Sequence, residues 1–545
     1  MKRLLPHRSR LIAATAVVAS AALLTGCAAG ASPSGGTTKA SSASTTKGTG
    51  SGGTLSIGMT AANPPSMDTL LSGSQGNEGF RFVGYQLFDG LTRGDLNQST
   101  KAPTPQPDLA TSWTASSDAT VWTFTLRSGV TFTDGTPFNA DAVVFNLDRY
   151  FKPGFEYGSA ALVGNAASAI GPVASYRAVD DHTVEITTST PDAALPEDAQ
   201  NILIASPTAI KADPTGFANH PVGTGPFVFS AQDSSSLTFT ANKDYFAGKP
   251  KLDKLVLKAI PDPAQRTAAF RSGSVNWIEA PNPDDIASLQ GSGAQIITNS
   301  YDHIWPWLLN AHSGPLSDVR VRQALNYAID RNAMATTLLH GTADPAEQLL
   351  PHSHPAYTAS GDIYDHDVAK AKSLLKAAGY AKGFDLTLMY PTSGSGNMEP
   401  TPMNEELQAD LAKVGVTVKL KPVEWAALLG QFLTGKFADG VDALNISLPL
   451  YQESIWNSLF ATGGFLNEGG YSNPKVDALL KEASGTVDRD ARYKLLQKAA
   501  ADITADAPWL FVVNDRNPRA LSPQVHNFVE PQSWFLDLTH VYVGS

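Results

Sequence analysis

One thiol is available to this chain for covalent chemistry. Cys27 is the only cysteine among 545 residues, and it ends the tetrapeptide Leu24-Thr25-Gly26-Cys27. A thiolate is a nucleophile and a site of modification, but a lone thiol cannot form an internal disulfide. Upstream, a positively charged start that includes Lys2 and Arg3 is followed by an apolar stretch over residues 11–24. This order is typical of a secretory signal, and the stretch is short for a membrane-spanning helix.

The tetrapeptide resembles the lipobox of bacterial lipoproteins, in which a branched apolar residue and two small residues precede the cysteine. The resemblance implies that residues 1–26 are a lipoprotein signal peptide and that Cys27 receives a diacylglycerol and becomes the new N-terminus. Residues 28–53 contain only Ala, Gly, Ser, Thr, Pro and Lys, which predicts a flexible tether over residues 27–53. The protein is then exported and lipid-anchored to the outer face of the cytoplasmic membrane. The alternative is an ordinary signal peptide with an incidental cysteine.

The remaining nucleophiles and metal-ligating residues form no recognised catalytic pattern. His352-Ser353-His354 offers two imidazoles between Pro351 and Pro355, but no third ligand is suggested nearby, so a surface loop is favoured over a metal site. We find no Gly-x-Ser-x-Gly elbow, His-Glu-x-x-His or Walker-type loop. With Cys27 assigned to anchoring, no thiol remains for catalysis. We predict no enzymatic activity, cofactor or metal, and keep a secreted hydrolase as an alternative.

Charge and composition exclude further classes of protein. The net charge is −11, and lysines and arginines are scattered, so nucleic acid is not an expected partner. Beyond the leader, no apolar run is long enough to span a bilayer. The length suggests two or three globular units with substantial cores.

Hydrophobic patterns predict the elements that must position any binding residues. Trp122, Phe124 and Leu126 alternate along a strand over residues 121–126, a second strand is expected over residues 130–133, and Asn139 is placed to cap a helix. Further strands are expected near residues 55–58, 184–187, 237–240 and 255–260, and a helix over residues 262–271.

The second half alternates helix and strand. Helices are expected from Asp318, Asp367 and Asn473, over residues 404–413, and over residues 488–506. Strands are expected over residues 384–390, 416–420 and 510–513. This alternation favours a sheet flanked by helices, and hence an α/β fold.

Four blocks of sequence carry a family resemblance. Pro107-Asp108-Leu109-Ala110-Thr111-Ser112-Trp113 precedes residues 122–138, and these are followed by Pro221-Val222-Gly223-Thr224-Gly225-Pro226-Phe227, residues 242–253 and residues 318–331. In this order they resemble the extracellular solute-binding proteins of family 5, the dipeptide, oligopeptide and nickel receptors of ABC importers. The resemblance covers residues 54–545.

The resemblance implies a periplasmic-binding-protein-like fold of two hinged lobes that enclose a ligand. The first lobe is expected over residues 54–309 with an embedded small subdomain, the second over residues 310–510, and residues 511–545 return to the first. The hinge strands are expected near residues 307–310 and 510–514. An ABC permease and its ATPase subunits are the implied partners of a monomeric receptor.

Most of the shared residues have structural interpretations. Gly223 and Gly225 are expected to permit unusual backbone angles in a tight connection, with phosphate binding as the alternative. Arg320 and Arg322 are expected to form ion pairs between elements. These motifs predict the scaffold and leave the ligand unspecified.

The ligand-binding signal departs from the family pattern. Peptide-binding members hold the free ammonium of the peptide with an aspartate in the second lobe. The corresponding residues 445–456 contain no aspartate, Leu448 takes the ammonium-binding position, and Glu453 sits several residues late. A buried ammonium without a carboxylate is strongly disfavoured, so binding of a free-amine peptide in the usual pose is in doubt.

Polar and aromatic side chains in this segment, and others elsewhere in the chain, suit an uncharged ligand instead, such as an oligosaccharide or a blocked peptide. The candidates are Asn445, Tyr451, Gln452, Trp456, Trp425, Trp277, Glu279 and Trp305. Core packing is the alternative for the aromatic residues among them.

The sequence thus favours a lipid-anchored receptor that delivers a peptide-like or oligosaccharide solute to an ABC importer. A ligand-sensing lipoprotein of the same fold is the alternative.

Overall fold

The computed structural model describes residues 50–450 and 453–544. Cys27, the signal peptide and nearly all of the expected tether lie outside these residues. The body is entered at Gly52 and Gly53, whose amides donate to Lys251 O and to the carboxylate of Asp253. Among the described residues, no helix has the length and apolarity needed to cross a bilayer.

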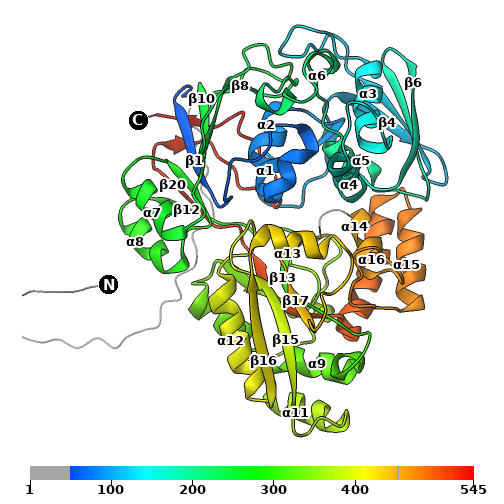
Figure 1. The fold of residues 1–545 in the computed structure, drawn as a ribbon, viewed down its shortest axis with the longest axis vertical. Helices are drawn as coiled ribbons and strands as arrows, with labels where there is room; N and C mark the ends of the chain where they lie inside the picture. Colours follow the sequence, from blue (N-terminus) through cyan, green and yellow to red (C-terminus); the bar gives the residue numbers. More distant parts are fainter. Residues whose placement is uncertain (1–49, 451–452, 545) are drawn as a thin grey trace, which may run out of the picture. The chain divides into compact units, whose positions relative to one another are not determined.

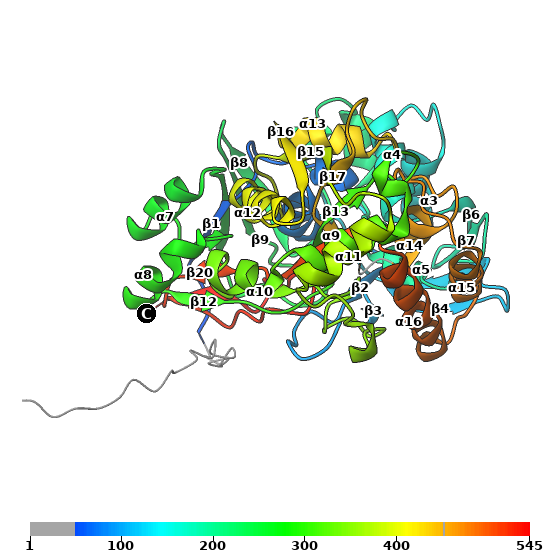
Figure 2. The ribbon, with the colours of Figure 1, turned by 90° about the horizontal axis from the view of Figure 1, so that it is seen from below.

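The first lobe is built on a mixed sheet, seen in the upper half of Figure 1. Its order is β12-β20-β11-β1-β10-β9-β8. The strands span Gln295–Ile297, Arg519–Leu521, Trp277–Glu279, Thr54–Met59, Lys254–Ala259, Ser236–Ala241 and Phe227–Gln232, in that order. Helices α7 (Pro263–Arg271) and α8 (Ile286–Gly291) lie at one end, and Figures 1 and 2 both place the C-terminal strand β20 beside β12 and α8. Residues far apart in the sequence therefore share this sheet.

A smaller four-stranded sheet with its own helices lies within the residues of the first lobe. This antiparallel sheet has the order β4-β5-β7-β6, with strands Ala110–Ala115, Val121–Leu126, Thr183–Thr188 and Val173–Asp180. Trp122, Phe124 and Leu126 are buried against helices α3 (Ala140–Phe151) and α4 (Ala160–Ala169). The strand expected over residues 130–133 is wrong: only an isolated bridge joins Thr131 to Pro137, because β4 pairs with β5 in its place.

The second lobe has its own sheet, of order β14-β19-β13-β17-β15-β16, with β18 paired to β13. These strands span Ala343–Pro345, Trp509–Asp515, His303–Leu309, Ala443–Asn445, Phe384–Pro391 and Val416–Val423, and β18 is Leu448–Pro449. Hydrophobic residues are buried on both faces, in two separate clusters. The helices around this sheet are α9 (Val319–Ala328), α11 (Val368–Ala377), α12 (Pro400–Ala412), α13 (Trp425–Phe432), α14 (Glu453–Phe460), α15 (Pro474–Ser484) and α16 (Arg489–Asp506). The mixed α/β architecture expected from the sequence is confirmed.

The chain passes between the two large sheets earlier than residue 309. Strands β13 and β19 pair with each other, Trp307 opposite Leu510, inside the sheet of the second lobe. The crossings are therefore residues 298–302 and 516–518, joined by a hydrogen bond from Asn299 N to Arg516 O at 3.0 Å. The expected hinge strands are strands of the second lobe, and both are buried along their whole length.

Helix starts follow the predicted capping residues. The side chains of Asn139, Asp318, Asp367 and Asn473 each accept a hydrogen bond from a backbone amide of the first turn. The helix expected over residues 404–413 begins four residues earlier, at Pro400, because proline is well suited to the first turn of a helix.

Gly223 and Gly225 serve close packing and not an unusual backbone angle. Neither residue has a positive φ. A Cβ at Gly223 would lie 2.1 Å from Leu87 O, and one at Gly225 would lie 2.5 Å from Leu87 C. The Val-Gly-Thr-Gly-Pro motif therefore lets two segments of the first lobe pass with their backbones in contact.

Arg320 and Arg322, in the family-like block over residues 318–331, do not form the expected ion pairs between elements. Arg320 pairs with Asp318 at the start of its own helix, on the surface. Arg322 is buried and donates to the carbonyl oxygens of Asp506, Ala507 and Leu316. It thereby satisfies acceptors at the C-terminal end of α16, as cations near a helix C-terminus do.

Replacing Gly223 with alanine should destabilise the protein, because the new methyl group meets rigid backbone. We expect the free energy of unfolding to fall by roughly 1–3 kcal/mol, as overpacked sites do. Gly430→Ala is the matched control, since Gly430 lies in α13 with no atom within 4 Å of an added Cβ, and alanine there should be neutral or stabilising. Urea unfolding measures both; equal midpoints for the two variants would contradict the close-packing argument.

Candidate ligand-binding site

A cavity of about 500 Å³ lies where the two lobes face each other. From the first lobe, Gly76, Phe80 and residues 161–169 of α4 line it. From the second lobe, helix α13, strand β18 and helix α14 supply the wall. Trp534, from the C-terminal segment, and His303, at the start of β13, complete it. A cavity of this size suits a small organic molecule.

The described residues that line this cavity include no Asp, Glu, Lys or Arg. The one ionisable side chain among them is His303, and burial together with the nearby Arg81 lowers the pKa of its imidazole to about 3. Large apolar side chains dominate the wall, among them Phe80, Trp425, Phe432, Leu448 and Phe465. The described wall is therefore uncharged at neutral pH.

Charged groups lie at one end of the cavity, where they bind one another. Ser395 and Trp534 also line a neighbouring pocket of about 170 Å³ that contains Arg81 and Glu279. Arg81 pairs with Glu279, Glu279 also pairs with Arg519, and Arg519 pairs with Glu530. All four side chains are buried, and we call this set the hinge ion network. Although burial alone would raise the pKa of Glu279, Arg519 and Arg81 hold it below its usual range.

At the other end, an ion cluster joins the lobes directly. Arg492 of α16 pairs with Glu453 of α14 and, at 2.8 Å, with Glu197 of α5 (Leu195–Asp198) in the first lobe. We call these three residues the interlobe latch. Ala193 N also donates to Ser484 O across the lobes, at 2.7 Å. This end borders a pocket of about 510 Å³, which shares Ala167, Ser168, Ile455 and Ser458 with the central cavity.

The lobes also meet at Gly76, which has a φ of +91°. A Cβ there would lie 3.0 Å from Ser395 Cβ and 3.7 Å from Trp425 Nε1, both in the second lobe. A side chain at this position would therefore hold the lobes apart. The bare backbone lets the indole of Trp425 approach the first lobe.

Of the residues proposed from the sequence, Trp425 lines the cavity, and so does Leu448. Tyr451 and Gln452 lie outside the described residues. The other proposed side chains are buried in hydrogen bonds of the scaffold: Asn445 with Pro306 O and Asn404, Trp456 with Leu450 O, Trp305 with Asn397 O, and Trp277 with Glu279, which itself belongs to the hinge ion network. Glu453 pairs with Arg492 and does not line the central cavity.

Residues 351–355 form turns in which His352 and Pro355 are exposed, but the side chain of His354 is turned inward. Its ring is 4 % exposed, packs near Trp456 and Tyr493, and accepts a hydrogen bond from Ala356 N. Burial lowers the pKa of its imidazole to about 3. Within residues 50–450 and 453–544, no three His, Cys, Asp or Glu side chains come together as metal ligands would.

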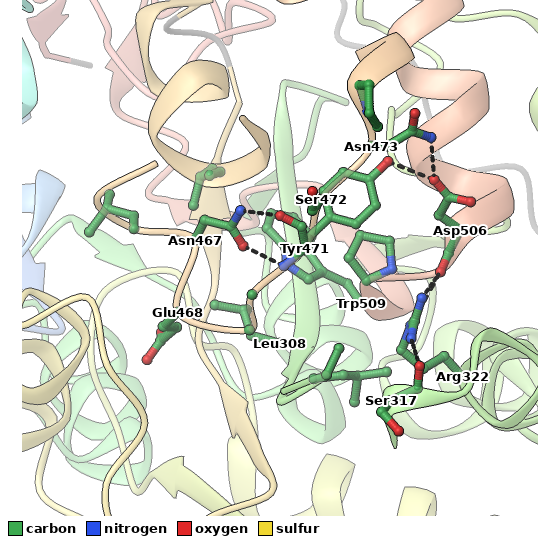
Figure 3. A pocket seen from close by; sticks show the side chains of 18 residues that line it. Leu308, Ser317, Arg322, Asn467, Glu468, Tyr471, Ser472, Asn473, Asp506 and Trp509 are labelled. Atoms are coloured by element: carbon green, nitrogen blue, oxygen red, sulfur yellow. Dashed lines mark hydrogen bonds between the residues drawn. The ribbon is translucent and has the colours of Figure 1, made fainter. Parts of the chain in front are cut away.

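A further pocket of about 340 Å³ lies wholly within the second lobe (Figure 3). Its polar groups largely satisfy one another: Tyr471 and Asn473 donate to the carboxylate of Asp506, and Asn467 holds the backbone of Tyr471. Glu468 differs, because neither carboxylate oxygen has a hydrogen-bond partner among the described residues. Its side chain points away from the Tyr471–Asp506 group, and burial raises its pKa to about 8. We assign this pocket to the packing of residues 467–474 on α16.

Comparison with known proteins agrees with the two-lobed geometry. Residues 104–464 match the model of the bacterial extracellular solute-binding proteins, family 5. The chain belongs to this family. It is 32 % identical to a heme-binding protein A of Haemophilus influenzae, over 78 % of this chain and 82 % of that one. A glutathione-binding protein GsiB of Pectobacterium atrosepticum is also 32 % identical, over 78 % and 84 % of the two chains.

A solved structure extends the family likeness to three dimensions. The periplasmic binding protein DppA of Helicobacter pylori, in complex with the peptide STSA, superposes with a TM-score of 0.77 at 25 % identity, covering 91 % of this chain and 99 % of that one. The family 5 fold expected from the four sequence blocks is confirmed. These relatives differ in the ligands that their names give, so the fold alone does not identify the solute of this chain.

The buried Glu468 makes stability depend on pH. Its pKa is about 8 in the folded chain against 4.5 for an ordinary glutamate, so the folded state keeps a proton that the unfolded state releases. Stability is therefore lost as pH rises from about 4.5 to about 8 and is constant above that range. Glu468→Gln lacks this titrating group. The difference in melting temperature between Glu468→Gln and the natural protein should therefore shift in favour of the variant as pH rises from about 4.5 to about 8.

Thermal unfolding at pH 5, 6.5 and 8 measures this effect. The control is Glu482→Gln, on the exposed side of α15, whose difference from the natural protein should stay flat with pH. A flat difference for Glu468→Gln as well would refute the assignment of a buried, protonated carboxyl.

Proposed function

We propose that this protein is the solute receptor of an ABC importer, anchored to the outer face of the membrane, which captures a peptide-like solute by lobe closure and delivers it to a permease. The observation that carries the proposal is the 500 Å³ cavity between two lobes that are joined by only two short crossings. A solute in this cavity contacts both lobes only when they are together, so it stabilises the closed arrangement over the open one.

A peptide-like solute is favoured over an oligosaccharide by the cavity wall. Sugars present hydroxyl groups in most directions, and burying them requires a matching set of polar partners. The described wall is mainly aromatic and aliphatic, with isolated polar groups from residues such as Asn77, Ser395 and Ser447. The relation to the Helicobacter pylori protein in complex with a peptide supports the same class.

Anchoring through Cys27 rests on the lipobox-like tetrapeptide and the leader before it. We expect Cys27→Ser to abolish labelling with radioactive palmitate and to move the protein from the membrane fraction to the soluble fraction. Ser51→Ala, in the expected tether, should change neither property. Membrane retention of Cys27→Ser would contradict lipid anchoring without affecting the proposal for solute capture.

Lobe closure is tested by small-angle X-ray scattering on the mature protein, purified from cells that express the full chain. Bound solute is stripped by mild guanidinium treatment and dialysis, identified by mass spectrometry, and then added back; a peptide digest of casein is the second probe. We expect the radius of gyration to be larger after stripping and to shrink on addition of a ligand. Proven binding with an unchanged radius would defeat the closure mechanism.

A further inference from the structure

Two tryptophans on the cavity wall carry indole N–H groups without an acceptor. Nε1 of Trp425 and Nε1 of Trp534 are both buried, and neither has a hydrogen-bond partner among the described residues. Trp425 comes from the second lobe, and Trp534 comes from the C-terminal segment that returns to the first lobe. Nδ1 of His303, on the same wall, is also without a partner, 3.7 Å from the Asp515 carboxylate.

Five other buried indoles in the described chain have acceptors. They donate at 2.5–3.2 Å: Trp122 to Asp192 O, Trp277 to Glu279, Trp305 to Asn397 O, Trp307 to Asn404, and Trp456 to Leu450 O. None of these five lines the central cavity. Both unpaired indole N–H groups lie on the wall where a solute is expected, and a buried donor without an acceptor disfavours the empty, closed arrangement.

The same wall offers nothing to a charged solute. Leu448 lies on this wall, where the family resemblance implies an ammonium-binding aspartate, and residues 445–452 contain no charged side chain in the sequence. Three carboxylates around the cavity are already engaged: Glu453 with Arg492, Glu279 with Arg81 and Arg519, and Glu78 with the amides of Thr60 and Ala61. Asp192, in the adjoining pocket, keeps one oxygen without a partner among the described residues but does not line the central cavity. An ammonium or carboxylate in the central cavity would lose water without gaining a counter-charge.

We infer that the central cavity takes an uncharged, largely apolar solute with acceptor oxygens that pair with Trp425 and Trp534, such as a peptide whose termini are acylated, amidated or cyclised. The inference rests on the proposed function and specifies its solute. The solute enters when the lobes are apart, and its carbonyl oxygens replace the water that the two indoles lose on closure. Recognition and closure are thereby coupled through the same two N–H groups.

Matched dipeptides test the charge requirement on the mature protein. Isothermal titration calorimetry compares Phe-Leu with N-acetyl-Phe-Leu-amide and with cyclo(Phe-Leu), which have the same side chains and differ in their termini. We expect at least one uncharged form to bind about 10-fold tighter than the free dipeptide, or more. Free Phe-Leu that binds as tightly as both uncharged forms, or binding of none of the three at millimolar concentration, would overturn the inference.

Substitutions test whether the indole N–H groups of Trp425 and Trp534 bind the solute. Trp425→Phe and Trp534→Phe keep an aromatic ring and remove the donor, so each should weaken binding of the preferred uncharged probe about 5-fold. Trp113→Phe is the control, since Trp113 lies in β4 of the smaller four-stranded sheet and not on the cavity wall. Leu448→Asp should shift the preference toward free Phe-Leu. Unchanged affinity in both cavity variants would refute the role of the indoles.

The two proposals fail in different ways. If free dipeptides bind tightly and compact the protein in scattering, the solute class inferred here is wrong and the receptor function stands. If bound solutes of every kind leave the radius of gyration unchanged, the capture mechanism itself is wrong.

Discussion

The arrangement of this protein depends on a chain of buried charges that have to be paired. Arg81, Glu279, Arg519 and Glu530 are each almost fully buried, and they come from four separate segments of the first lobe. A buried charge without a partner is far more costly than a lost surface contact. Because Arg519 follows the second crossing directly, the hinge ion network fixes where the chain re-enters the first lobe. Arg81 also lies over the ring of Trp534, at 4.7 Å, and so places one wall of the cavity.

The charged side chains between the lobes lie at the two ends of the central cavity and do not line its described wall. The hinge ion network is at one end and the interlobe latch is at the other, and in each the carboxylates pair with arginines of the same set. The latch joins the lobes by ion pairs, and Arg489 adds a second contact to Glu197 at 3.6 Å. Burial, followed by the neighbouring Glu453, raises the pKa of Glu197 to about 7. Closure thus has an electrostatic contribution independent of the solute, and the solute supplies the difference that a permease can detect.

Local chemistry in the sequence predicted many of the elements, although not correctly at residues 130–133, and it did not predict their tertiary partners. Capping side chains such as Asn139 and Asp367 mark helix starts because the cap acts within one turn. Residues 307–310 were predicted to form a hinge strand at the end of the first lobe, yet a fully buried strand has no pattern that tells which sheet it joins. The same limit applies to the site. Trp277, Trp305 and Trp456 are core tryptophans, and nothing local distinguishes them from Trp425. Trp534 becomes a wall residue only because the tail folds back across the crossings.

Family scaffold and solute chemistry are therefore set by different residues in this chain. The shared glycines at 223 and 225 bring first-lobe backbones together, and Arg322 closes a helix end; none of these lines the central cavity. Gly76 contributes both to the packing of the scaffold and to the wall of the solute cavity. Its bare backbone allows the second lobe to come within contact distance, and that approach covers the indole of Trp425. A group that is buried only on closure, and satisfied only by a solute, makes the empty closed state less favourable than the filled one. This difference in free energy, and not the shape of the hinge, is what lets a two-lobed protein report that its solute is bound.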